Sequence, residues 1–363
     1  MKIDLVALGW DATPDPDTAP SATPDPGPST GLALDCRPGR VARVDRGVCT
    51  VLCAAGAVRA SLAGAVLARA ARDPAQLPCA GDWVLVRTWP DQRITVEAVL
   101  PRRTALIRRT ADKDSTGQVL AANLDAAAVV EPMHPAPDIG RIERLLALAW
   151  ESGAQPLVVL TKCDLAADAD AVARQITEVA PGVRVLPVSA RRGDGLAELR
   201  PLVARGRTLG LLGPSGAGKS TLVNALAGVD VMPTQGIRGV DGKGRHTTTY
   251  RALIMIPGGG AVLDTPGVRA VGLLDDATGL DRAFADIAAL ADACRFADCA
   301  HDGEPGCAVA AALESGDLAP RRWESWRKLQ REVVYESRRR DARLAAEERA
   351  RWRRIRRDQR AAR

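Results

Sequence analysis

The chain has 363 residues, of which 46% are hydrophobic and 26% charged, and its net charge at pH 7 is +6. A chain of this length is expected to form about two or three domains rather than a single core. No apolar run approaches the roughly 20 residues of a membrane span, and the first residues lack the pattern of a signal peptide, so we expect no membrane association and a cytoplasmic location. In that compartment the eight cysteines are not expected to form a disulfide framework.

The N-terminal segment, 1–32, contains a long stretch rich in proline, aspartate and threonine. Residues 11–31 have almost no large apolar side chains, and a stretch of this composition cannot bury a core. We therefore expect a disordered linker there. A regulatory or partner-binding arm is the alternative that the composition leaves open.

The next region, 33–103, contains short β-rich pieces broken by glycines, among them 82–88 and 93–100. This spacing indicates a small closed barrel, and a five-stranded OB fold fits the length. Aromatic residues for base stacking are scarce, so RNA contact would depend mainly on five arginines: Arg43, Arg46, Arg59, Arg87 and Arg93. The alternative is a barrel that only docks on the following domain.

Residues 104–275 alternate between apolar strand-like runs and helical patterns. We expect a helix that ends at Gly153, and strands at or near 126–130, 157–160, 183–188, 208–212, 252–256 and 261–264. This alternation predicts a mostly parallel sheet that is covered by helices on both faces.

A P-loop pattern lies in the middle of that region, between an apolar run at 209–212 and a helical pattern at 221–226. The spacing is Gly213-x4-Gly218-Lys219-Ser220, in the strand–turn–helix context that the motif requires. Lys219 is expected to reach the β- and γ-phosphates of a nucleotide, and the Ser220 hydroxyl to hold Mg²⁺. The residues predicted to surround the phosphates are Gly213, Pro214, Ser215, Gly216, Ala217, Gly218, Lys219, Ser220 and Thr221.

Three further motifs favour GTP over ATP. The first resembles the guanine-reading NKxD pattern, with threonine in the asparagine place: Thr161, Lys162, Cys163 and Asp164. Ser189 and Ala190 would offer backbone N–H groups to guanine O6. An Asp-x-x-Gly motif supplies Asp264, near Mg²⁺, and Gly267, whose N–H would contact the γ-phosphate.

The order of these motifs is unusual. The base-reading motifs at 161–164 and 188–190 precede the P-loop, and the motif at 264–267 follows it. Ligands of such sheets bind outside the carboxyl ends of the strands, whatever order the strands take in the chain. The sequence therefore predicts a circularly permuted GTPase domain.

The glycine-rich stretch 236–244 and three consecutive threonines indicate a switch segment. We expect Thr248 to bind Mg²⁺ in the GTP state, although Thr247 and Thr249 are adjacent candidates. Many GTPases place glutamine directly after the Asp-x-x-Gly motif to orient the attacking water, but Val268 stands there in this chain. His246 is therefore the candidate catalytic group, together with Thr248 and Lys219.

The region 276–335 contains four residues with the spacing of a zinc site: Cys294, Cys299, His301 and Cys307. Three thiolates and one imidazole can close a tetrahedral site, so we expect one structural zinc ion per chain. A disulfide or a redox site is the alternative.

The last part of the chain is strongly basic. Residues 321–363 contain 17 lysines and arginines against 7 acidic residues, on a pattern that can form a long helix, with an Arg-rich tail at 336–363. This concentration of charge indicates binding to a polyanion such as RNA. A solvated charged helix is the alternative.

Taken together, the permuted GTPase motifs, the preceding barrel, the GRHTTT switch and the Cys/His segment resemble the small ribosomal subunit-dependent GTPase A family over roughly residues 34–335. The resemblance implies an OB barrel, a permuted GTPase domain and a helical zinc domain. It also implies late maturation of the small ribosomal subunit in the bacterial cytoplasm, with that subunit and its rRNA as partners and as stimulators of GTP hydrolysis.

We expect a monomer that binds GTP or GDP with magnesium. The proline-rich stretch at 11–31 and the Arg-rich extension depart from the family pattern and leave the RNA contacts open. Two other functions are weighed: a GTP-dependent RNA-modification enzyme, for which the sequence offers no separate nucleophile, and a non-hydrolysing RNA-binding scaffold.

Overall fold

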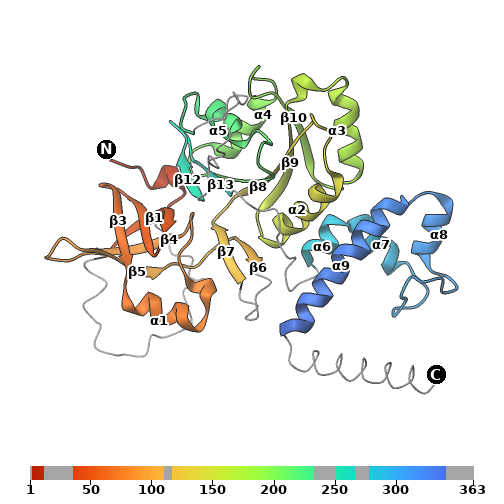
Figure 1. Cartoon of the computed structure of the whole chain (residues 1–363), viewed down its shortest axis with the longest axis horizontal. Coiled ribbons are helices and arrows are strands. Elements are labelled where there is room, and N and C mark those ends of the chain that lie inside the picture. Colours follow the sequence, from red (N-terminus) through yellow and green to blue (C-terminus); the bar gives the residue numbers. More distant parts are fainter. Residues whose placement is uncertain (1, 12–35, 110–116, 233–250, 266–277, 341–363) are drawn as a thin grey trace, which may run out of the picture.

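The structure is a computed structural model, and it describes the whole chain except residues 1, 12–35, 110–116, 233–250, 266–277 and 341–363. Three folded parts follow one another along the chain: a β-barrel, an α/β domain and a group of helices (Figure 1). In the described part of the chain, no helix combines the length and the apolar character needed to cross a bilayer.

The barrel closes in the strand order β1-β2-β3-β5-β4, with β1 paired to both β2 and β4. A helix between β3 and β4 completes the arrangement of an OB fold, which confirms the predicted barrel. Small and β-branched side chains such as Val41, Val51 and Val84 fill its interior. The elements are β1 (Cys36–Asp45), β2 (Val48–Cys53), β3 (Gly56–Leu62), α1 (Gly64–Arg72), β4 (Trp83–Thr88) and β5 (Ile94–Val99).

An antiparallel hairpin joins the barrel to the α/β domain, formed by β6 (Ala105–Arg109) and β7 (Gly117–Ala122). This hairpin was not among the strands expected from the sequence. It rests on segment 74–80 of the barrel, where Cys79 packs against Val119 and Ala122.

The α/β domain contains a six-stranded sheet in the order β10-β9-β8-β11-β13-β12. All neighbouring strands are parallel except β12, which runs antiparallel to β13 at the edge. The elements are β8 (Ala126–Pro132), α2 (Ile139–Glu151), β9 (Gln155–Thr161), α3 (Ala169–Glu178), β10 (Arg184–Val188), α4 (Leu196–Leu199), β11 (Thr208–Leu212), α5 (Lys219–Ala227), β12 (Ala252–Met255) and β13 (Ala261–Asp264).

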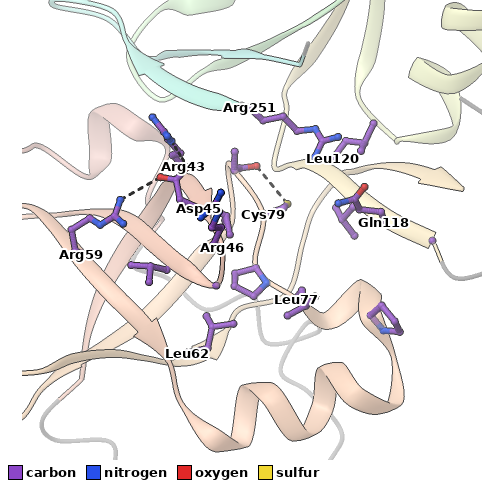
Figure 2. Close-up of a pocket in the computed structure, with 18 residues that line it drawn as sticks. Arg43, Asp45, Arg46, Arg59, Leu62, Leu77, Cys79, Gln118, Leu120 and Arg251 are labelled. Atoms are coloured by element: carbon purple, nitrogen blue, oxygen red, sulfur yellow. Dashed lines mark hydrogen bonds and ion pairs between the residues drawn. The ribbon is translucent and has the colours of Figure 1, made fainter. Parts of the chain in front are cut away.

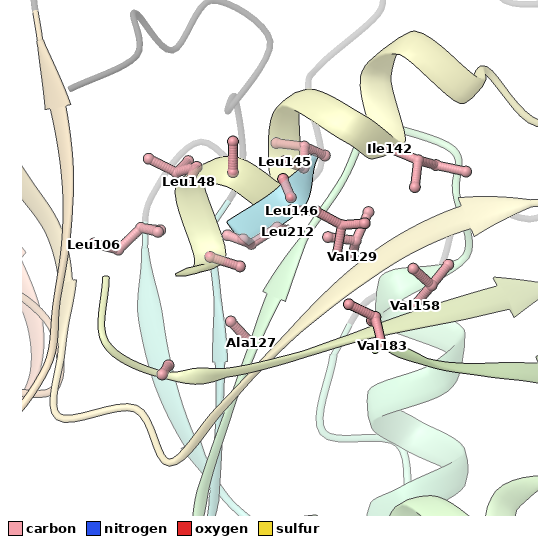
Figure 3. Close-up of a cluster of buried hydrophobic side chains, with 14 of the residues drawn as sticks. Leu106, Ala127, Val129, Ile142, Leu145, Leu146, Leu148, Val158, Val183 and Leu212 are labelled. Atoms are coloured by element: carbon pink, nitrogen blue, oxygen red, sulfur yellow. The ribbon is translucent and has the colours of Figure 1, made fainter. Parts of the chain in front are cut away.

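Alternating side chains of the strands form two cores on opposite faces of this sheet. Val129 and Leu212 pack with α2 and α3 on one face, as Figure 3 shows for the cluster around α2. Val130 and Leu211 pack with α4 and α5 on the other face. This two-sided burial explains why the central strands are apolar throughout.

Among the described residues after the sheet, the helices are α6 (Thr278–Ala283), α7 (Ala285–Asp292), α8 (Ala308–Ser315) and α9 (Pro320–Arg340). Their apolar residues, including Phe284, Val309 and Leu329, belong to the same core as α2. A buried ion network also joins α9 to α2. The fully buried carboxylate of Glu143 accepts hydrogen bonds from Arg321, Arg322 and Ser325, and Arg322 also donates to Asp286 on α7.

A second buried charge lies at the junction of the barrel with the α/β domain. Arg40 is only 1% exposed. Its guanidinium donates to the carbonyl oxygens of Leu8, Gly81 (3.2 Å) and Asn123 (3.0 Å), and to the hydroxyl of Thr208 (2.8 Å) at the start of β11. The described N-terminal residues are therefore attached to both domains through one side chain.

Candidate nucleotide and metal sites

The parallel strands bring the predicted nucleotide motifs to one edge of the sheet. Because β8, β9, β11 and β13 run in the same direction, their carboxyl ends meet there. The P-loop follows β11, the 161–164 loop follows β9, and Asp264 ends β13 directly opposite Leu211.

The backbone of the P-loop requires its glycines. Gly216 and Gly218 lie in the left-handed region, with φ of +82° and +89°, where other residues are strained. A Cβ at Gly213 would lie 2.2 Å from the carbonyl oxygen of Val130, so the loop can approach β8 only with glycine at that position. The Lys219 amine donates to the carbonyl oxygens of Gly213 (2.8 Å) and Pro214 (2.9 Å), which places it within the loop.

The chemistry of Asp264 fits a neighbouring cation. Its side chain is 2% exposed, and its Oδ1 has no hydrogen-bond partner within the described residues. Burial raises the pKa of Asp264, and the positive charge of Lys219 opposes that rise. The adjacent Thr265 hydroxyl donates to the Leu211 carbonyl at 2.7 Å and fixes the end of the strand. An unpaired carboxylate oxygen next to a P-loop is suited to Mg²⁺ and its water ligands.

The 161–164 loop is held against the P-loop. The Thr161 hydroxyl, which stands where the usual pattern has asparagine, donates to the Ala217 carbonyl at 2.5 Å. Lys162 has φ of +58°, and its amine lies 3.4 Å from the His134 carbonyl oxygen. The next residue, Cys163, is half-buried and starts a short 3₁₀ turn.

The second base-reading motif affects the ionisation of Asp164. A hydrogen bond from Ser189 lowers the pKa of Asp164, so its carboxylate is available as an acceptor at neutral pH. Ser189 itself is fully buried and bridges to Asp194, and Ala190 is partly buried against the core on the α5 face. The two motifs that were separated in sequence are thus joined at the side chain that would read guanine.

Three predicted site residues lie outside the residues that the structure describes: His246, Thr248 and Gly267. Their roles in binding Mg²⁺, the γ-phosphate and the attacking water stay predictions.

Sequence reasoning missed Glu131, a fully buried carboxylate at the end of β8. It accepts from the Arg141 side chain and, at 3.2 Å, from the backbone N–H of Asp138 at the start of α2. Its own carbonyl lies 3.5 Å from the Thr161 hydroxyl. Glu131 therefore orders the loop beside the nucleotide edge, and a single acidic residue in an otherwise apolar strand was the available signal.

The cysteine and histidine cluster of the helical part is brought together as predicted. The four ligand atoms of Cys294, Cys299, His301 and Cys307 lie within 4.8 Å of one another. The Nδ1 atom of His301 is 3.5 Å from the sulfurs of Cys294 and Cys307, which are 4.0 Å apart. Zn–S and Zn–N bonds of about 2.3 and 2.0 Å require ligand separations of about 3.5–3.8 Å in a tetrahedron, so this cluster can hold a metal ion.

The arginines considered for RNA contact differ in their surroundings. Arg87 and Arg93 lie over the ring of Trp89, at 4.1 and 5.6 Å from its centroid, and its indole N–H donates to Thr95. By contrast, Trp83 is buried against Trp10. Trp83 therefore contributes to the domain junction and is not a surface for base stacking.

An α/β sheet with a P-loop, a second loop beside it at the end of β9, and a buried aspartate at the end of β13 defines a P-loop GTPase domain, here with its motifs in permuted order. The RsgA GTPase family model matches residues 99–274. A relative from Streptomyces coelicolor named small ribosomal subunit biogenesis GTPase RsgA is 52% identical over 353 residues, covering 96% of this chain and 92% of the relative. A relative of the same name from Opitutus terrae is 46% identical over 337 residues, covering 89% and 91%.

Solved structures agree with this assignment. The crystal structure of YjeQ from Thermotoga maritima has a TM-score of 0.60 at 26% identity and covers 82% of this chain and 99% of that one. The structure of YloQ, described as a circularly permuted GTPase, has a TM-score of 0.57 at 23% identity over 84% and 96%, and supports the fold alone. The chain belongs to the RsgA GTPase family and is a GTP hydrolase, which confirms the predicted resemblance, the fold class and the reaction.

Proposed function

We propose that this GTPase acts in late maturation of the small ribosomal subunit in the cytoplasm, that it binds the subunit and its rRNA, and that the bound subunit stimulates hydrolysis. The observation that carries the proposal is the 52% identity, over 96% of the chain, to a relative named for small-subunit biogenesis. The basic region at 321–363 adds support, because its excess charge suits a polyanionic partner.

In this proposal the P-loop residues 213–221 hold the phosphates through backbone N–H groups and Lys219, and Gly267 adds a contact to the γ-phosphate. Ser220 and Thr248 hold Mg²⁺, and Asp264 accepts from its water ligands. The ion offsets the negative charge of the phosphates. The unpaired, buried Oδ1 of Asp264 supports this assignment.

The base is read by Asp164, which accepts from the N1–H and N2–H₂ groups of guanine. Lys162 lies along the base, and the loop of Ser189 and Ala190 offers N–H groups to O6. The lowered pKa of Asp164, to which Ser189 contributes most, supports this arrangement, since it keeps the carboxylate ionised at the loop.

Water activation is assigned to His246, because the side chain of Val268 has no polar atom. His246→Ala is expected to lower the subunit-stimulated turnover by about 10²-fold, the usual effect of a positioned proton-handling group, and to leave GTP affinity unchanged. Full stimulated turnover in this variant would assign the role to a group from the ribosome or to backbone.

The Cys/His cluster holds one structural zinc ion per chain in this proposal. The donor set of three sulfurs and one nitrogen, with no fifth candidate ligand in the described cluster, supports a closed site. The protein is proposed to act as a monomer. Light scattering of the purified chain measures its molar mass in solution and tests this directly.

The function is tested by measuring GTP turnover alone, with isolated small subunits and, as a control, with large subunits. Cosedimentation with small subunits is measured in parallel with GDP and with a non-hydrolysable GTP analogue. We expect small subunits, but not large subunits, to raise GTP turnover. We expect more of the protein to cosediment with small subunits in the presence of the GTP analogue than in the presence of GDP. Absence of both effects would refute a role on the small subunit and would favour a scaffold that acts elsewhere.

A further inference from the structure

A cavity of about 1360 Å³ lies where the barrel, segment 74–80 and the β6–β7 hairpin meet, apart from the nucleotide edge (Figure 2). Its walls come from distant parts of the chain. The barrel supplies Arg46 and Leu62, the following segment supplies Leu77, and the hairpin supplies Gln118. Arg251, the residue directly before β12, completes the wall.

The cavity is electropositive. Four arginines line it against a single carboxylate, Asp45. That carboxylate is already engaged, because it accepts from Arg43 Nε at 2.6 Å and lies 3.3 Å from Arg59 Nη1 (Figure 2). The cavity therefore has no free negative charge of its own among its lining residues.

Arg251 carries the strongest indication of a ligand. Its Nε atom is buried and has no hydrogen-bond partner in the described parts of the chain. The Nε atom of Arg108 on β6 is likewise buried and has no hydrogen-bond partner among the described residues. In the strand register of the hairpin, Arg108 lies opposite Gln118 on β7. Burial lowers the pKa of Arg251, and the nearby positive charge of Arg108 lowers it further. Each of these two guanidinium groups thus has a buried Nε–H donor with no partner among the described residues, and the charge of Arg108 is near enough to affect Arg251.

This arrangement is costly for the protein alone and favourable with an oxyanion present. A buried donor without an acceptor destabilises the fold, as does the proximity of two like charges. Arginine presents planar N–H groups that match the oxygens of a phosphate, and such charged hydrogen bonds are stronger than neutral ones.

We propose that Arg251, backed by Arg108 and flanked by the Gln118 amide, binds a phosphate group at the seam between the barrel and the GTPase domain. The phosphate comes from an RNA backbone, an identity that rests on the proposed function. Apolar walls at Leu62 and Leu77 leave room for the rest of a nucleotide chain. Arg251 directly follows segment 233–250, which contains the predicted switch threonine. The residue that binds the phosphate is therefore adjacent in sequence to that segment.

The first measurement tests the site itself. Protein labelled with ¹⁵N-arginine is titrated with inorganic phosphate, and the Nε–H resonances are followed; Arg251→Lys and Arg108→Lys identify the two signals. We expect both signals to shift together on saturation. If neither signal moves, the site is refuted, whatever the GTPase assays show.

The second measurement tests the source of the phosphate. Binding of a fluorescent 12-nucleotide oligouridylate to the full chain is measured against salt for the unmodified protein, Arg251→Gln and Arg174→Gln. Arg174 is an exposed residue on α3, remote from the cavity, so its substitution removes the same charge elsewhere. We expect Arg251→Gln to weaken binding about tenfold and to reduce the salt slope by about 0.7, while Arg174→Gln changes neither.

The outcomes separate the two claims. Equal effects of the two glutamine variants would refute an RNA site at Arg251 and leave only general attraction to the charge. If inorganic phosphate shifts the arginine Nε–H signals but added RNA does not compete with that phosphate, the site binds a free anion and the RNA part of the proposal is overturned. The unfolding midpoint of each variant is also measured. A midpoint equal to that of the unmodified protein excludes misfolding as the cause of weaker binding.

Discussion

The buried carboxylate of Glu143 offers the sharpest test of how the C-terminal helices are attached to the GTPase domain. It accepts from Arg321 at 2.8 and 3.2 Å, from Arg322 at 2.9 Å and from Ser325 at 2.6 Å. We predict that Glu143→Gln lowers the free energy of unfolding, because the amide removes the negative charge and points N–H donors at guanidinium donors.

The expected loss is about 3 kcal/mol. Removing one partner of a buried ion pair costs roughly 3–5 kcal/mol. The lower end applies here because Arg322, which is 4% exposed, keeps two contacts of 2.6 Å to Asp286, and because the Arg321 side chain is 44% exposed and can turn to water.

A matched control is available on the surface. Glu198 pairs with Arg184 at 3.4 Å, with both side chains more than half exposed. Glu198→Gln makes the same chemical change and is expected to cost less than about 1 kcal/mol. Urea unfolding followed by circular dichroism gives the two free energies, and hydrogen exchange of α9 shows whether the loss is local. A Glu143→Gln variant as stable as Glu198→Gln would refute this account of the attachment.

Three further predictions concern the candidate sites. Asp164→Asn is expected to lower GTP affinity more than tenfold, and the variant is expected to bind xanthosine triphosphate instead, both measured by calorimetry. Unchanged discrimination between GTP and ATP in this variant would contradict the base assignment. Cys299→Ala is expected to lose the bound zinc, measured by mass spectrometry of the metal, and to expose 285–320 to exchange, since the binding energy is also folding energy; a metal-free unmodified protein would argue against the site. Asp264→Asn is expected to raise the unfolding midpoint of the nucleotide-free protein at pH 7, because a carboxylate whose folded pKa is raised destabilises the fold above that pKa. That gain is expected to shrink as the pH falls through the raised pKa towards 3.8, and a gain that is constant with pH would contradict the burial argument.

Features that depend on local sequence were predictable. The P-loop lies between an apolar strand and a helix in the chain itself, so its position followed from spacing alone. The strand expected at 126–130 is Ala126–Pro132 in the structure, and the helix expected to end at Gly153 ends at Glu151. The four metal-ligand candidates lie within one short segment, which is why their proximity could be predicted.

Features that depend on distant partners were not predictable. The β6–β7 hairpin is short, and its pairing is supported by contacts to segment 74–80 rather than by its own pattern. Glu143 occupies a buried position on an amphipathic helix, but its partners lie near residue 322. The local sequence of neither segment indicates that Glu143 pairs with these arginines.

The buried guanidinium of Arg40 bears on any attempt to treat the domains as interchangeable modules. Its hydrogen bonds reach the N-terminal residues, the junction before β8 and the first residue of the strand that leads to the P-loop. An isolated barrel would keep the arginine and lose most of its acceptors, while an isolated GTPase domain would keep Asn123 and Thr208 without their donor. Neither fragment would reproduce the stability it has in the intact chain, so exchange of barrels between relatives would have to carry the partners of this side chain with it.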